Sequence, residues 1–126
     1  MIQLDYKSSK PIYEQIVEQM KFDVMKQYLN PGDAIPSVRK LALELKITPG
    51  TVSKAYQELE RQGVIETIRG KGTFIASKIE MKQDEEKVDR IRQQIRTLIM
   101  ELRMMGYEKK EIVDMVQDLY GEICSA

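Results

Sequence analysis

Small polar and basic residues gather in two short stretches of the sequence, 47–57 and 69–72. The first, ITPGTVSKAYQ, contains hydroxyl, glycine, ammonium and amide groups at Thr48, Gly50, Thr51, Ser53, Lys54 and Gln57. The second, RGKG, alternates cations with glycines at Arg69, Gly70, Lys71 and Gly72. Hydroxyls and amides can form hydrogen bonds with base edges, and cations can neutralise phosphates. Lys54 could pair either with guanine acceptors or with a phosphate. Both stretches are therefore candidate nucleic-acid-binding segments.

Each of these features also has an ordinary structural interpretation. Thr48 and Pro49 are residues that commonly cap and begin a helix. Any tight hairpin needs glycines such as Gly70 and Gly72, and Lys71 can be a solvated tip. Taken one at a time, the features fit either interpretation.

The composition narrows the range of possible chemistry. The 126 residues are enough for one compact domain, or for a small domain with an appendage. Histidine, the commonest general base and zinc ligand, is missing. A single cysteine, Cys124, rules out an internal disulfide and leaves a solvated thiol or, less favoured, an intermolecular bridge. We therefore expect no enzymatic activity, no metal site and no cofactor.

The charge is unevenly distributed along a chain whose net charge is zero. Residues 1–78 carry 12 Lys and Arg against 9 Asp and Glu, and residues 79–126 carry 8 against 11. This asymmetry favours an anionic partner for the first part only. No apolar run approaches the length of a membrane span, and the start of the chain does not resemble a signal peptide, so we expect a cytoplasmic protein without a membrane partner.

The spacing of apolar residues predicts three helices in residues 11–63. The first is expected to begin at Pro11, to run to residue 29 with Ile12, Ile16, Met20 and Val24 inward, and to end at the turn NPGD. Ser37 is placed to cap a short second helix, VRKLALEL, by accepting a hydrogen bond from a free backbone N–H group. Thr48 is expected to cap a third helix that ends near Gly63. Its predicted inward residues are Val52, Ala55, Tyr56 and Leu59.

Two short helices joined by a few residues predict a helix-turn-helix, with the N-terminal end of the third helix facing outward. The segments VIETI and TFIA flank RGKG and are rich in β-forming residues, so they predict a β-hairpin. A hairpin directly after a helix-turn-helix is a wing. Residues 1–78 are therefore predicted to form a winged helix-turn-helix.

Residues 79–126 are predicted to form two helices. Apolar residues in the first recur with the alternating spacing of three and four that helices use to pack at a shallow angle. They are Val88, Ile91, Ile95, Leu98, Leu102 and Met105. In the second, after Gly106, the expected inward residues are Ile112, Val113, Val116, Leu119, Tyr120 and Ile123. Two helices enclose too little surface to be stable alone, so we expect the last helix to pack on the long one. The remaining apolar face is expected to pair with a second chain, and the candidate dimerisation residues are the six of the long helix together with Ile112, Val116 and Leu119.

Several segments resemble, in register, the winged helix-turn-helix of the GntR family of bacterial transcription regulators. They are PGDAIPSVRKLA, TVSKAYQELERQGVIE and GKGTF, and the likeness extends over residues 11–76. The short tail of two helices is similar to the YtrA-like branch, in which such a segment mainly makes the dimer. The resemblance implies a dimeric repressor.

The resemblance also implies roles for single residues. Arg39, two residues after Ser37, occupies a position at which family members have an arginine that reaches DNA. Many members have arginine or asparagine near the start of the recognition helix, where this chain has Pro49, Gly50 and Ser53. A glycine there lets the backbone approach a phosphate or a base edge closely.

Two functional hypotheses follow from these observations. The first is a sequence-specific DNA-binding transcription regulator that acts as a homodimer on a palindromic operator of double-stranded DNA. The second is a winged-helix module that binds protein through the same faces, without DNA specificity. Neither the operator nor a small-molecule effector can be read from the sequence.

Overall fold

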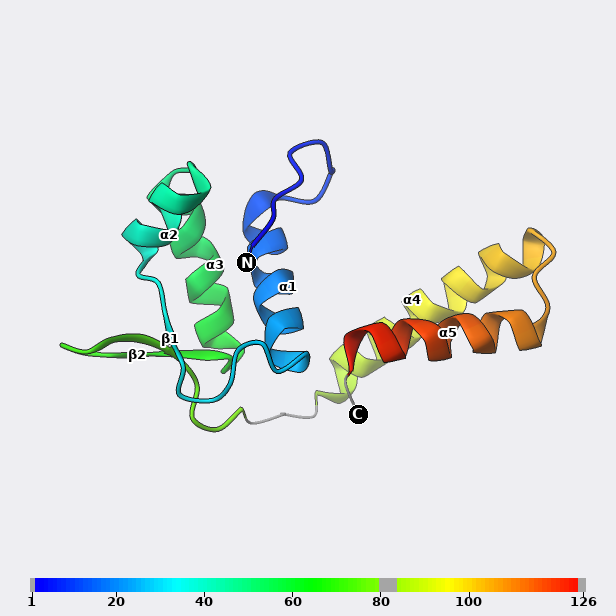
Figure 1. Ribbon diagram of the computed structural model, residues 1–126. Coiled ribbons are helices and arrows are strands. Elements are labelled where there is room, and N and C mark those ends of the chain that lie inside the picture. The colour runs from blue at the N-terminus through cyan, green and yellow to red at the C-terminus, as the bar shows by residue number, and fades with distance from the viewer. Residues whose placement is uncertain (1, 80–83, 125–126) are drawn as a thin grey trace. The chain divides into compact units, whose positions relative to one another are not determined.

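The computed structural model describes residues 2–79 and 84–124 and divides the chain into two compact units, Met1–Glu80 and Met81–Ala126. Figure 1 shows the elements of each unit. The first contains α1 (Ile12–Met25), β1 (Ala34–Ile35), α2 (Val38–Leu45), α3 (Pro49–Arg61), β2 (Ile65–Ile68) and β3 (Gly72–Ile75). The second contains α4 (Glu85–Met104) and α5 (Lys109–Ile123). The predicted mainly helical fold is confirmed. None of the helices in the described residues is long and apolar enough to span a membrane.

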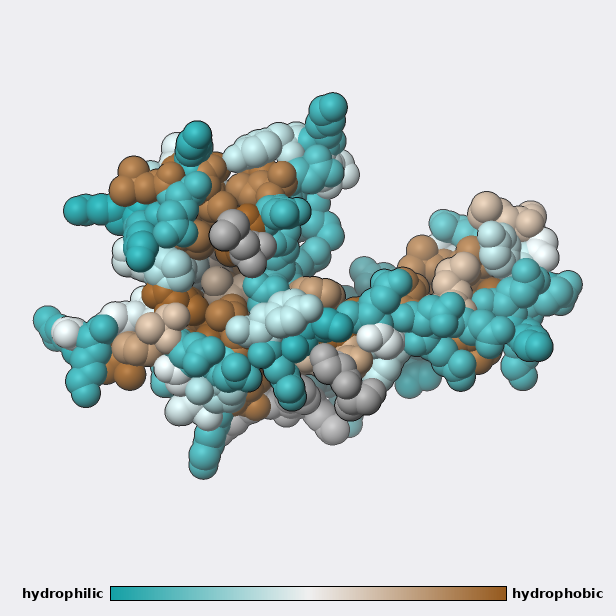
Figure 2. Space-filling view, viewed as in Figure 1, coloured by the Kyte–Doolittle hydropathy of each residue, from teal (hydrophilic) through white to brown (hydrophobic). Residues whose placement is uncertain are grey.

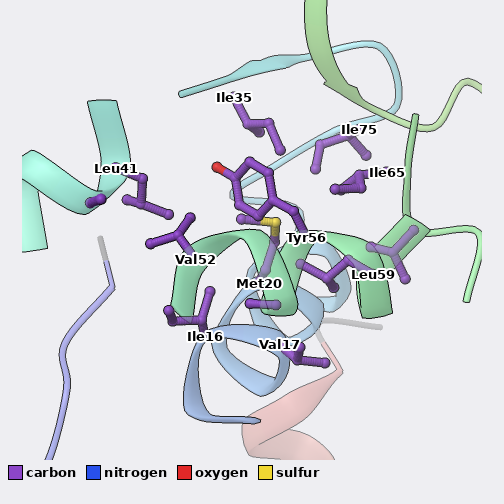
Figure 3. Packing of buried hydrophobic residues seen from close by; sticks show 13 residues of the cluster. Ile16, Val17, Met20, Ile35, Leu41, Val52, Tyr56, Leu59, Ile65 and Ile75 are labelled. Carbon is purple, nitrogen blue, oxygen red and sulfur yellow. The ribbon is translucent and has the colours of Figure 1, made fainter. Parts of the chain in front are cut away.

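One apolar core holds the first unit together. Ile16 of α1, Val52 and Leu59 of α3 and Ile75 of β3 have no exposed surface. Figure 3 shows these side chains converging with others from α2 and the sheet. All four residues predicted to face inward from α3 are buried, which confirms the helical period read from the sequence. The core therefore fixes α3 against α1, α2 and the sheet.

The sheet has three strands rather than the two predicted. β3 lies in the middle and pairs antiparallel with both β2 and β1. The sequence-based prediction missed β1 because its two residues are too few to show alternation, and Pro36 follows them directly. In the structure β1 closes the edge of β3 that the hairpin alone leaves open.

Helix α1 is shorter than predicted. It begins at Ile12, so Pro11 is its N-cap rather than its first helical residue, and it ends at Met25 instead of residue 29. Gln27 has a φ of 63°, a left-handed conformation that a helix does not continue through. Ile16 and Met20 are buried as predicted, whereas Ile12 and Val24 are only half-buried.

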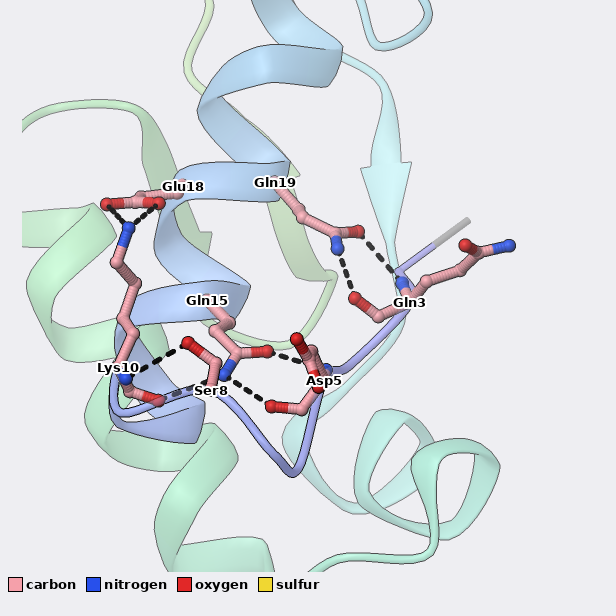
Figure 4. A network of polar contacts seen from close by, with 7 residues as sticks. All are labelled: Gln3, Asp5, Ser8, Lys10, Gln15, Glu18 and Gln19. Atoms are coloured by element: carbon pink, nitrogen blue, oxygen red, sulfur yellow. Dashed lines mark hydrogen bonds and ion pairs between the residues drawn. The ribbon is translucent and has the colours of Figure 1, made fainter. Parts of the chain in front are cut away.

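A polar network joins the N-terminal segment to α1 (Figure 4). The buried Gln15 accepts a hydrogen bond from the Asp5 backbone N–H (2.8 Å) and donates to the carbonyls of Asp5 (3.0 Å) and Lys10 (2.9 Å). Gln19 likewise exchanges two hydrogen bonds with the backbone of Gln3. Two glutamines one turn apart thus pair with an extended segment as a neighbouring strand would. The residues of this network also line a small open cavity.

The second unit has almost no interior of its own. Among residues 84–124 only Ile112 is buried. Val113, Val116, Leu119, Tyr120 and Ile123, all predicted to face inward, are exposed. For Val113, Tyr120 and Ile123 this prediction was wrong in the single chain, because two helices without a third layer can cover only part of their apolar faces. Val116 and Leu119 were also expected to face a second chain, and their role there stays a prediction. Figure 2 shows hydrophobic residues at the surface of this unit among hydrophilic ones.

Candidate nucleic-acid interface

Helices α2 and α3 form the predicted helix-turn-helix. The turn between them depends on Lys46, the C-cap of α2, which has the left-handed conformation usually taken by glycine (φ 58°). The backbone N–H of Ile47 then bonds to the carbonyl of Ala42 (3.0 Å). Three residues, 46–48, thus separate the two helices. The sequence offered no glycine to signal this turn.

The start of α2 presents the first two candidate residues. Ser37 caps the helix as predicted, with its Oγ accepting a hydrogen bond from the backbone N–H of Lys40 (3.1 Å). Ser37 and Arg39 are both exposed. Arg39 forms no ion pair among the described residues. The cap uses one acceptor lone pair of the Ser37 hydroxyl. The Arg39 guanidinium is separately open to solvent.

A buried tyrosine positions this end of α2 against α3. The Tyr56 hydroxyl donates a hydrogen bond to the carbonyl of Pro36, immediately before the cap (2.6 Å). Burial, with a smaller contribution from the Glu44 carboxylate, raises the pKa of Tyr56 to about 12. The phenol therefore stays protonated and keeps donating. Sequence reasoning identified Tyr56 as a core residue but missed this polar role.

The start of α3 differs from its prediction in one respect. Thr48 is the N-cap residue, but its side chain accepts no hydrogen bond from the backbone of the helix. Its hydroxyl instead lies 3.0 Å from the hydroxyl of Thr51, one turn along. The backbone N–H of Thr51, to which a capping side chain would bind, instead donates to the backbone carbonyl of Thr48 (3.1 Å). The expectation of a side-chain cap at Thr48 was thus wrong.

The other candidates on α3 lie at different depths. Gly50, Lys54 and Gln57 are exposed, and Thr51 and Ser53 are half-buried. A Cβ atom added at Gly50 would meet no heavy atom within 4 Å, so the fold does not require glycine there. Lys54 places its Nζ 4.1 Å from the centroid of the Tyr13 ring on α1. Tyr13 was not among the residues that the sequence suggested.

The predicted turn RGKG forms the tip of the β2–β3 hairpin. The backbone N–H of Lys71 bonds to the carbonyl of Ile68 (2.9 Å), which closes the turn. Gly70 and Gly72 have φ values of +81° and +121°, which side-chain-bearing residues adopt with strain. Arg69 and Lys71 are exposed, and neither forms an ion pair among the described residues. The hairpin extends past the helices of its unit (Figure 1).

The second unit exposes most of the predicted dimerisation residues. We call the exposed ones the apolar seam: Val88, Ile91, Ile95, Leu98, Met105, Val116 and Leu119. Leu98 is 56% and Met105 73% exposed, although Met105 lies at the C-cap of α4 rather than within it. Leu102 is half-buried, and Ile112 is buried within its own unit. Ile112 is therefore a correction to the prediction, since a partner chain could not reach it.

Residues 12–75 match the family described as bacterial regulatory proteins, gntR family. The chain belongs to the GntR family. The matched residues run from the start of α1 to the end of β3 and include every candidate residue on the helix-turn-helix and the wing. The likeness first seen in short motifs thus extends over the whole apolar core of this GntR unit.

Relatives of this GntR-family chain match beyond the winged unit. It is 43% identical, over 98% of its length, to the HTH-type transcriptional repressor YtrA of Bacillus subtilis and covers 95% of that protein. This confirms the predicted relation to YtrA. A crystal structure of a transcriptional antiterminator from Listeria monocytogenes EGD-e superposes with a TM-score of 0.86 at 41% identity, over 98% of this chain and 92% of that one.

A DNA complex also belongs to this structural group. AraR(DBD) in complex with operator ORR3 matches with a TM-score of 0.51 at 27% identity, over 59% of this chain and 89% of that one. The shared region corresponds in extent to one unit of the GntR-family chain. Among the described residues, no group of three or more His, Cys, Asp or Glu side chains is arranged to hold a metal ion.

Proposed function

We propose that this GntR-family chain is a transcription repressor that binds double-stranded DNA sequence-specifically as a homodimer. The start of α2, the start of α3 and the wing tip would contact the DNA. The observation that carries the proposal is the exposure of Arg39, Arg69 and Lys71 at two of these places without an ion pair among the described residues. Cations that are not neutralised within the protein are available to phosphates and base edges.

Each part of the interface has a distinct proposed role. The hydroxyl and amide groups of α3, at Thr51, Ser53 and Gln57, read base edges in the major groove, and the absence of a side chain at Gly50 lets the helix backbone approach the DNA. Ser37 and Arg39 contact the strand beside that groove, and the wing carries Arg69 and Lys71 to the adjacent backbone or groove. The operator complex of AraR(DBD) and the repressor name of YtrA support the proposal that the chain is a DNA-binding repressor.

The homodimer is proposed from the apolar seam. Large apolar residues that stay exposed in a monomer are unfavourable, and a second chain that covers them would stabilise the pair through the hydrophobic effect. Two winged helix-turn-helix units, one from each protomer of a dimer, also bind a two-fold operator more tightly than a single one does. We propose a cytoplasmic, non-enzymatic role that needs no cofactor and leaves any effector to be identified.

The decisive experiment selects duplexes bound by the purified chain from random or genomic DNA and then measures their affinity. We expect a palindromic motif bound with a steep dependence on salt. Arg39→Ala should lose most of the discrimination between this motif and random duplex. Lys26→Ala removes the same charge at the C-cap of α1 and should change neither the affinity for the motif nor the affinity for random duplex. Recovery of no motif, with binding that disappears in heparin, would contradict the proposal and favour a protein-binding winged module.

A further inference from the structure

Lys54, on the first turns of α3, does not extend straight into solvent. Its ammonium nitrogen lies 4.1 Å from the centroid of the Tyr13 ring at the start of α1. A cation this close to an aromatic face is held by the negative potential of the ring. The Lys54 side chain nevertheless remains exposed, so the remaining N–H groups of its ammonium can reach another partner.

A second contact shows at which end of the helices this pair lies. Lys21 of α1 donates to the side-chain oxygen of Gln62, just beyond α3 (2.7 Å). Lys21 and Gln62 are 41 residues apart in the sequence, the same separation as Tyr13 and Lys54. An equal separation at both ends means that α1 and α3 run parallel, with their N-terminal ends together. The Tyr13–Lys54 pair is thus at the end of α3 that carries Thr48, Gly50 and Thr51.

The tyrosine is itself held in place. Tyr13 is half-buried and packs against the apolar core, and its hydroxyl donates to the Glu14 carboxylate (3.3 Å). Partial burial, followed by the Glu14 and Glu58 carboxylates, raises the pKa of Tyr13. The ring therefore remains a neutral phenol at neutral pH and offers Lys54 a fixed aromatic face. A lysine held this way loses less side-chain entropy when it binds a ligand.

We propose that Tyr13 is a positioning residue that holds the Lys54 ammonium between α1 and α3, where it contacts a DNA phosphate rather than a base edge. This inference rests on the DNA-binding function proposed above. A base-reading side chain extends away from its helix into the groove, whereas Lys54 turns sideways toward α1. Its contribution to binding is accordingly independent of sequence, and Tyr13 acts on DNA only through it.

The test measures binding of the full-length chain to the selected operator and to random duplex over a range of salt. Lys54→Met should weaken both by the same factor and reduce the log–log salt slope by about 0.9 for each phosphate that is no longer neutralised. Tyr13→Leu should weaken both about two- to fivefold, as expected for an exposed cation–π contact. Tyr13→Phe keeps the ring and should bind like the wild type. In the Lys54→Met background, Tyr13→Leu should have no further effect.

A measurement without DNA separates this inference from the proposed function. The Cε protons of Lys54 should show an upfield ring-current shift in NMR spectra of the wild type and of Tyr13→Phe, but not of Tyr13→Leu. Thermal unfolding shows whether Tyr13→Leu is folded. If it is not, the ring-current shift of the wild type and the effect of Lys54→Met on operator and random duplex carry the test. Absence of the ring-current shift, additive effects of the two substitutions, or a larger effect of Lys54→Met on operator than on random duplex would overturn the inference. If the shift is present but the wild type binds no duplex, the proposed function fails and the phosphate role of Lys54 fails with it.

Discussion

The hydroxyl of Tyr56 on α3 lies 2.6 Å from the backbone carbonyl oxygen of Pro36, the residue before the cap of α2. This hydrogen bond joins the recognition helix to the start of the preceding helix, where Ser37 and Arg39 lie. The Tyr56 ring is buried in the core, and the hydrogen bond of its hydroxyl adds a directional constraint to that packing. It therefore sets the relative position of two proposed DNA-contacting segments.

Tyr56→Phe should lower the free energy of unfolding by roughly 1 to 2 kcal/mol, because the Pro36 carbonyl loses its donor. Operator affinity should fall as well, since the start of α2 is less firmly placed. Chemical denaturation and fluorescence anisotropy measure the two effects. Tyr28→Phe removes a hydroxyl from an exposed tyrosine and is the matched control. Equal stability of both variants would show that the hydrogen bond contributes nothing.

The same hydroxyl predicts a dependence of stability on alkaline pH. Burial raises the pKa of folded Tyr56 to about 12, above the ordinary value of 10.0. The folded state holds this proton more tightly, so the stabilisation is complete below pH 10 and is lost as the pH rises to 12. Because solvent partly screens the hydroxyl, the loss amounts to about 1 to 2 kcal/mol. Subtracting the profile of Tyr56→Phe removes the lysine titrations common to both chains, and a flat difference across this window would contradict the shift.

Gly50→Ala separates the needs of the fold from those of DNA binding. The backbone at Gly50 is helical and its surroundings are open, so alanine should raise stability, by up to about 1 kcal/mol. Operator affinity should nevertheless fall severalfold if the backbone approaches DNA at this point. Gly121→Ala, in an equally open helical position, should raise stability alone. A Gly50→Ala chain that binds the operator as well as the wild type would remove Gly50 from the interface.

Gly70→Ala should affect the wing more than the core. A Cβ at Gly70 meets no neighbour within 4 Å, so the cost comes from its φ of +81° and is about 1 kcal/mol. The turn that presents Arg69 and Lys71 should shift, and the salt slope of operator binding should fall toward that of an Arg69→Ala, Lys71→Ala double variant. The apolar core is remote from this change, so circular dichroism should be unaltered.

Leu98→Glu should convert the proposed homodimer into monomers. A carboxylate in the middle of the apolar seam would be buried without a partner at the contact between two chains. Sedimentation at micromolar concentration measures the change. Operator affinity should fall by roughly a factor of ten or more, because only one protomer then binds the operator at a time. Gln93→Glu adds the same charge on an exposed position of α4 outside the seam and should leave the mass unchanged. A wild-type chain that is itself monomeric would contradict the dimer directly.

Local patterns predicted α2 and α3 well. Apolar residues three and four apart identified the buried face of α3, and Ser37 was recognised as a cap because hydroxyl residues are favoured before a helix, although the same reasoning failed at Thr48. The turn glycines of the wing were equally clear. Patterns failed where the feature was too short or carried by an unusual residue: β1 has two residues, and Lys46 and Gln27 take left-handed conformations without being glycine.

The sequence by itself determined the order of the helices, the wing turn, the cationic first part and the membership of the GntR family. Each of these depends on residues that are close together along the chain, or on motifs in register. Only the tertiary structure decided that Lys54 lies over Tyr13, that Tyr56 supports Pro36, and that Ile112 is covered while the apolar seam is not. These are contacts between separate elements, and they depend on how packing turns one helix against another, which the periodicity of each helix alone does not specify.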